Sequence, residues 1–120
     1  MQKPEAISSA VNLFEEATSL NLFKNLVVQV EKDFNLASVD LDIDTIESTT
    51  PNSLLDGIES KIYYLLQYDT STYINLLYII DVPEHSIKYL KAENLEQFSK
   101  DISFLILKRC WMKVWYKANY

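Results

Sequence analysis

The chain has few of the residues that make tight turns. It contains a single glycine, Gly57, and three prolines among 120 residues. Sandwiches and barrels built from many short strands need both residue types at their turns. The scarcity therefore favours helices joined by short polar loops. The length favours a single helical domain, residues 1–120, with one hydrophobic core.

Residues for metal, cofactor and nucleophile chemistry are scarce as well. The one cysteine, Cys110, excludes an internal disulfide and a zinc site made from a cysteine pair. The one histidine, His85, is expected on the surface in the first turn of a helix. The acidic run 40–47 lacks the glycine and the glutamate that an EF-hand loop needs at its sixth and twelfth positions. We therefore expect no metal, no cofactor and no catalytic residue.

Long apolar runs are missing too. The longest is about YINLLYII, residues 73–80, and it is interrupted by Asn75. A bilayer-spanning helix needs about 20 apolar residues, so no transmembrane segment is expected. The N-terminal sequence MQKPEAISSAVNLFEE carries three glutamates and does not resemble a signal peptide. A cytoplasmic protein is expected.

What the chain does have is a helical spacing of apolar residues along most of its length. They recur every three or four positions, with charged residues between them, which is typical of amphipathic helices. The first two helices, within residues 4–34, are expected to be separate or to form one bent helix. Expected N-caps are Ser19 or Asn21, Thr50 and Asn94, and Asp81 with Glu84 is expected to form a capping box. The predicted helices span about residues 4–18, 23–34, 51–67, 73–80, 82–92 and 95–117.

Residues 37–50 interrupt this pattern. Three apolar residues alternate with three aspartates in VDLDID, residues 39–44. An alternation of period two normally indicates a strand, but the chain offers no convincing partner strand. We expect an extended acidic arm whose apolar side chains lie on the helices, or that pairs with a second copy of the protein. The predicted fold class is all-α: a compact bundle of about five helices with this arm.

Charge is distributed unevenly. The formal net charge is -6, and all 17 acidic residues lie before residue 102, whereas residues 102–120 carry four basic residues and no acid. An acidic body repels phosphate backbones, so nucleic acid is not an expected partner. On a helical wheel Arg109, Lys113 and Lys117 stack on one face beside Ser99 and Ser103, away from the two tryptophans. This favours a core helix with a solvated basic edge; the alternative is a surface helix on anionic lipid.

Tyrosine is unusually frequent. Eight tyrosines occur, six of them between residues 63 and 89. Tyr64 and Tyr68 are one helical turn apart, on a face separate from the apolar stripe of their helix. Tyrosine combines apolar area with a polar tip, which suits surfaces that become buried on contact. The alternative is a rim of partly buried rings around the chain's own core.

Two stretches, LLYIIDVPEHSI and LILKRCWMKVWYK, within Leu76–Lys117, resemble small helical proteins of unknown function found in Bacteroidetes. The resemblance implies an all-helical fold and carries over no active site.

These features together predict a non-catalytic protein–protein interaction module, with a homodimer as one form of it. One alternative is a peripheral membrane protein that uses the basic, tryptophan-containing C-terminal helix, and another is a small helical enzyme with a carboxylate site. The expected interaction surface comprises Tyr64, Tyr68, Arg109, Lys113 and Lys117.

Overall fold

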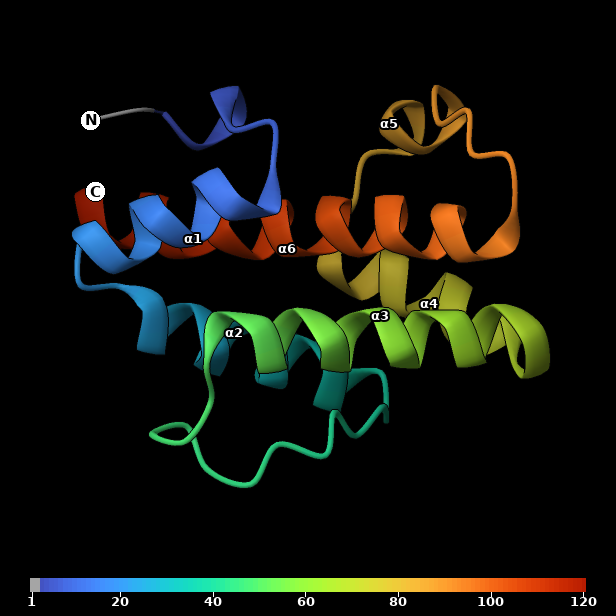
Figure 1. Ribbon diagram of the computed structural model, residues 1–120, viewed down its shortest axis with the longest axis horizontal. Coiled ribbons are helices and arrows are strands. Elements are labelled where there is room, and N and C mark those ends of the chain that lie inside the picture. Colours follow the sequence, from blue (N-terminus) through green and yellow to red (C-terminus); the bar gives the residue numbers. More distant parts are fainter. Residues whose placement is uncertain (1–2) are drawn as a thin grey trace.

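The computed structural model describes residues 3–120, and the regular elements of that part are all helical (Figure 1). The predicted all-α class, a compact bundle of about five helices, is therefore confirmed. The radius of gyration is 13.5 Å, close to the ~13.6 Å that chain length predicts for a compact domain. The elements are the 3-10 helix η1 (Pro4–Ala6), α1 (Ala10–Ser19), α2 (Phe23–Leu36), α3 (Pro51–Tyr68), α4 (Thr70–Ile80), α5 (Glu84–Lys88) and α6 (Leu95–Asn119).

Helix α6 is the centre of the bundle and packs against η1, α1, α2, α3 and α4. Trp111 and Trp115 are 0% and 6% exposed, so both indole rings lie inside the protein, as predicted. Ser99 and Ser103, expected on a solvated edge, are also buried, and that part of the prediction was wrong. Each donates its hydroxyl proton to a carbonyl of the preceding turn, which removes much of the cost of burying it.

The N-terminal segment differs from the predicted helix over residues 4–18. Pro4 begins the short η1 helix, and α1 begins only at Ala10, where the Ser9 hydroxyl accepts a hydrogen bond from the amide of Asn12 at 3.2 Å. The next helix is separate, because Asn21 takes a left-handed backbone conformation (φ 59°) between α1 and α2. Asparagine tolerates that conformation better than most residues, so the chain can turn there.

The predicted caps at Thr50 and Asn94 are confirmed, whereas α2 begins after Leu22 without the side-chain cap expected from Ser19 or Asn21. Thr50 forms a reciprocal capping box with Ser53 at the start of α3, and Asn94 accepts from the amide of Gln97 at the start of α6. The capping box predicted at Asp81 was wrong. This residue instead ends α4 with a left-handed backbone (φ 69°), and α5 begins after Pro83 without a side-chain cap. A left-handed residue after the last turn is a common helix ending.

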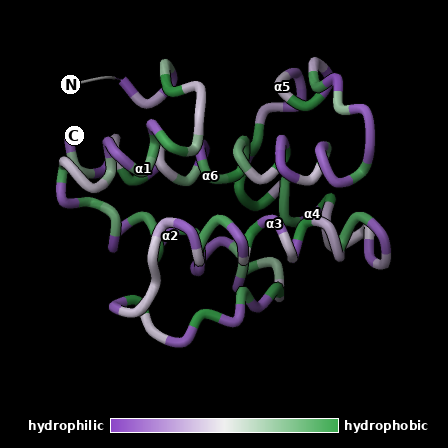
Figure 2. Tube along the Cα trace, viewed as in Figure 1, coloured by the Kyte–Doolittle hydropathy of each residue, from purple (hydrophilic) through white to green (hydrophobic). Residues whose placement is uncertain are grey.

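The arm, residues 37–50, contains no helix or strand and lies beside α2 and α3 (Figure 1). Its backbone is not extended throughout, because Ser38 and Asp42 are left-handed (φ 60° and 57°) and residues 46–48 form a turn. Figure 2 shows hydrophobic and hydrophilic residues alternating along it. Val39 and Leu41 are each 6% exposed, and Ile43 packs partly buried against the core. The Asp42 carboxylate lies 2.9 Å from the Lys61 ammonium of α3. The arm therefore places its apolar side chains on the helices, as expected.

Candidate functional site

The most exposed aromatic pair on α3 is formed by Tyr64 and Tyr68. Their side chains are 56% and 71% exposed, and their ring centroids are 5.1 Å apart with the planes inclined by 47°. The one-turn spacing places the two rings side by side, as helix geometry requires. The structure thus brings these two predicted residues together on one open surface.

Tyr73 is the buried exception among the tyrosines. It is 8% exposed, and burial raises its pKa to about 12. The others are exposed but occupy separate elements: Tyr78 is on α4 and Tyr89 follows α5. At the end of α6, Tyr116 stacks on Tyr120 and donates its hydroxyl proton to Glu5. The tyrosines do not form the single interface that their clustering in the sequence suggests.

The tyrosine pair continues a stripe on the side of α3 that faces the arm. Gly57, Lys61, Tyr64 and Tyr68 follow one another at intervals of four, three and four residues, which keeps them on one face of a helix. Gly57 faces the arm, since a Cβ on it would lie 3.8 Å from the Leu41 carbonyl oxygen. One turn later Lys61 pairs with Asp42. The two rings then extend the stripe toward the C-terminal end of α3.

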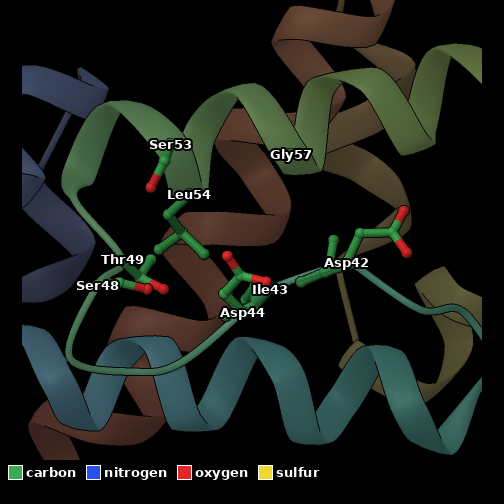
Figure 3. A pocket seen from close by; sticks show the side chains of 9 residues that line it. Asp42, Ile43, Asp44, Ser48, Thr49, Ser53, Leu54 and Gly57 are labelled. Atoms are coloured by element: carbon green, nitrogen blue, oxygen red, sulfur yellow. The ribbon is translucent and has the colours of Figure 1, made fainter.

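A cavity of about 250 Å³ lies between the arm and the first turns of α3 (Figure 3). Figure 3 shows the Asp44 carboxylate directed into it beside Leu54, whereas the Asp42 carboxylate is directed away. Within residues 3–120 Asp44 has no hydrogen-bond or ion-pair partner, while Asp42 is held by Lys61. The cavity is lined by Leu41, Asp42, Ile43, Asp44, Ser48, Thr49, Ser53, Leu54 and Gly57.

The polar atoms of this cavity are mainly acceptors. The hydroxyls of Ser48 and Thr49 donate to the Thr45 carbonyl oxygen, and that of Ser53 donates to the Thr50 carbonyl oxygen. Their protons are therefore used within the chain. Residues 37–60 contain six acidic residues and no lysine or arginine. The cavity and its surroundings are negatively charged, and their chemistry suits a cationic group that donates several hydrogen bonds.

Sequence reasoning missed this cavity, because the arm and α3 had to be placed together before it could be recognised. Two signals in the sequence pointed toward it. The alternation in VDLDID fixes which side chains of the arm face outward, and the only glycine of the chain falls inside a predicted helix.

The three basic residues of the predicted surface do not form a free basic face. The Arg109 guanidinium lies 3.3 Å from the Asp81 carboxylate, and the Lys113 ammonium lies 2.8 Å from the Asp33 carboxylate. Lys117 is exposed near the end of α6. The predicted solvated basic edge was therefore wrong for Lys113, whose side chain is only 24% exposed, because α2 packs over that side of α6.

Asp33 is the centre of a buried polar cluster between α2 and α6. It is 3% exposed, and it also accepts from the Gln29 amide at 3.2 Å and from the Cys110 thiol at 3.6 Å. Burial, followed by the neighbouring Asp33 charge, raises the pKa of the Cys110 thiol far above its usual range. The thiol stays protonated and unreactive at neutral pH. Within residues 3–120 Asp33 is the only buried carboxylate, so no buried carboxylate pair is present there.

A second depression, of about 420 Å³, lies between α5, η1 and α6. Leu105, Met112 and Val82 contribute apolar side chains to it, and the Arg109–Asp81 pair lies in its wall. His85 also lines it and is exposed, as predicted. Its arginine is paired with Asp81, and the depression is also lined by Glu5 and Lys108, so its wall carries charges of both signs.

Comparison with protein-family models, curated proteins and solved structures gave no match to this chain. The resemblance to helical Bacteroidetes proteins accordingly stays a prediction. In the part of the chain that the structure describes, no helix combines the length and the apolar character needed to span a membrane. The same residues contain no group of three or more potential metal ligands close enough to hold an ion.

Proposed function

We propose that this protein is a non-catalytic interaction module that binds another protein through the arm-facing edge of α3. The observation that carries the proposal is the Tyr64–Tyr68 pair, two adjacent rings that are 56% and 71% exposed. Tyrosine is enriched at protein interfaces and among the residues that dominate binding energy. A partner that covers both rings gains apolar burial without requiring this chain to rearrange.

The free energy gained by covering the two rings can be compared with the cost of association. An aromatic side chain buries about 150–250 Å², so covering the exposed parts of two rings removes roughly 250 Å² from water. At about 25 cal/mol per Å² this is worth ~6 kcal/mol. Association alone costs an estimated ~4–15 kcal/mol. The rings therefore need additional contacts, and the arm and the cavity beside them are the nearest source.

The membrane alternative has less support. Trp111 and Trp115 lie in the core, and Arg109 and Lys113 are paired with carboxylates of the same chain. Binding lipid through these residues would require α6 to leave the bundle, which would expose most of the core. The enzyme alternative has a single buried carboxylate within residues 3–120, Asp33, and its charge is matched by Lys113.

A symmetric homodimer through this edge is disfavoured by charge. A two-fold interface places the same patch of both copies in contact. Here that would bring together two surfaces whose residues 37–60 carry six acids and no base each. Repulsion between like charges therefore favours a partner of different composition.

The test is a comparison of two double variants. Tyr64→Ser/Tyr68→Ser removes the pair, and Tyr78→Ser/Tyr89→Ser is the matched control, since its tyrosines are 81% and 77% exposed on other elements. Partners captured by the tagged protein are quantified by mass spectrometry, and self-association is measured by light scattering. We expect a partner that the wild type and the control retain and that the Tyr64/Tyr68 variant loses. Retention of every partner by that variant, or equal loss in both variants, would overturn the proposal.

A further inference from the structure

We infer that the partner presents an extended segment bearing two arginines to this edge of α3. One arginine side chain enters the cavity beneath the arm, and the other lies on the rings of Tyr64 and Tyr68. The inference rests on the proposed function and specifies the chemistry of the partner.

The cavity has the size and chemistry for one long cationic side chain. Its volume of about 250 Å³ is below the roughly 300–1,000 Å³ of pockets that hold drug-sized ligands. Leu41, Ile43 and Leu54 provide apolar walls for a methylene stem. Asp44, which has no partner within residues 3–120, directs its carboxylate into the space (Figure 3). A carboxylate can accept two parallel hydrogen bonds from a guanidinium, which makes arginine the best match.

Gly57 is a second feature that keeps this space open. It is the only glycine, it lies inside α3, and it lines the cavity. Packing within the chain does not require it, because an added Cβ would meet its nearest neighbour, the Leu41 carbonyl oxygen, at an ordinary 3.8 Å. Glycine in a helix is otherwise unfavourable. Its missing side chain leaves the helix backbone open to a ligand on the cavity side.

The tyrosine pair suits a second arginine. A guanidinium stacks on aromatic faces more readily than an ammonium does. The nearest base on the stripe is Lys61, and its charge is already matched by Asp42 at 2.9 Å. A cation approaching the rings is therefore only weakly repelled by the positive charge on α3.

Helix geometry sets the spacing of the two arginines. Gly57 and Tyr64 are seven residues apart, which is about 10 Å along a helix axis at ~1.5 Å per residue. An extended segment advances about 3.3 Å per residue. Three residues cover that distance, so the second arginine is expected three positions after the first, or three before it in the opposite direction.

The experiment uses fluorescein-labelled ten-residue peptides of alanine and serine that contain two cationic residues. One peptide has arginines three positions apart, a second has adjacent arginines, and a third has lysines three positions apart. Fluorescence anisotropy at low salt measures the affinity for each protein variant. We expect the spaced-arginine peptide to bind most tightly, and Asp44→Asn or Tyr64→Ser/Tyr68→Ser to weaken it about tenfold, the loss of one charged hydrogen bond or one stacking contact.

Two further variants separate binding from fold stability and from general charge. Gly57→Ala is expected to weaken the peptide about tenfold by filling the cavity wall, while thermal melting of the protein is unimpaired. Glu15→Gln removes an exposed acid of α1 and is expected to leave binding unchanged. In ¹⁵N spectra the peptide should shift the amides of residues 41–57 and 64–68 most strongly.

The inference is overturned if the lysine peptide binds as tightly as the spaced-arginine peptide, if Gly57→Ala leaves the affinity unchanged, or if the shifts scatter over all acidic surfaces. Its failure differs from failure of the proposed function. If no peptide binds but partner capture still depends on Tyr64 and Tyr68, the interaction module stands and the arginine segment is wrong. If a captured partner is a second copy of this chain, the module also stands and a basic partner is excluded.

Discussion

Replacing Lys113 with methionine tests how much the contact between α2 and α6 depends on one buried charge pair. Methionine keeps much of the length and apolar stem of lysine and removes only the charge. Asp33, 3% exposed, then loses its ammonium partner at 2.8 Å and keeps the Gln29 amide at 3.2 Å and the weakly donating Cys110 thiol at 3.6 Å. The variant therefore leaves a buried carboxylate without a compensating cation.

Removing one partner of a buried pair typically costs ~3–5 kcal/mol. The Lys113 side chain keeps 24% of its surface exposed and Gln29 still donates, so we expect the lower end, about 3 kcal/mol. For a domain of this size that lowers the melting temperature by roughly 12 °C, at ~4 °C per kcal/mol. Urea unfolding followed by tryptophan fluorescence measures it directly, since both tryptophans lie in the same helix as Lys113.

Two comparisons make this prediction specific. Lys117→Met removes an exposed cation that forms no ion pair within residues 3–120, and it should change stability by less than ~0.5 kcal/mol. Asp33→Leu/Lys113→Met removes both charges and should recover most of the loss. A cost below ~1 kcal/mol, or equal costs for the single and double variants, would refute the reasoning.

Two further variants test helix propensity and burial. Gly57→Ala should raise the free energy of unfolding by up to ~1 kcal/mol, since alanine favours a helix and the added Cβ meets only an ordinary 3.8 Å contact; a lower melting temperature would contradict this. For Tyr73, burial raises the folded pKa to about 12, above the usual value of about 10. The stabilisation that comes from the protonated Tyr73 hydroxyl in the folded state is therefore present below pH ~10 and lost as the pH rises toward 12. Between pH 9 and 11 the free energy of unfolding should fall less for Tyr73→Phe than for the wild type in urea titrations. An identical pH dependence of the two proteins would be the contrary result.

Much of the helical framework could be predicted because it depends on residues close together in the chain. The caps at Thr50 and Asn94 each join a side chain to an amide three residues away. The alternation in VDLDID placed Val39 and Leu41 inward without any strand partner. Where two local solutions competed, sequence reasoning could choose wrongly: Asp81 ends α4, although its spacing to Glu84 also fits the start of a helix.

Which side chains remain on the surface depends on contacts between residues that are far apart in the chain. Lys113 falls on the polar side of a helical wheel, yet it forms a partly buried ion pair with Asp33, 80 residues earlier. Ser99 and Ser103, on the same side of the wheel, are also buried. Of the five predicted surface residues, only Tyr64 and Tyr68 lie side by side on one open face.

The sequence by itself determined that the chain is helical, where most helices begin and end, and which side of the arm faces inward. These features follow from periodicity and from hydrogen bonds within a few residues. The tertiary structure alone decided which charges are matched within the chain and which remain for a partner, and it alone formed the cavity between the arm and α3. Each of those outcomes joins residues from different elements, and the spacing of apolar residues along one helix does not encode which helix will cover it.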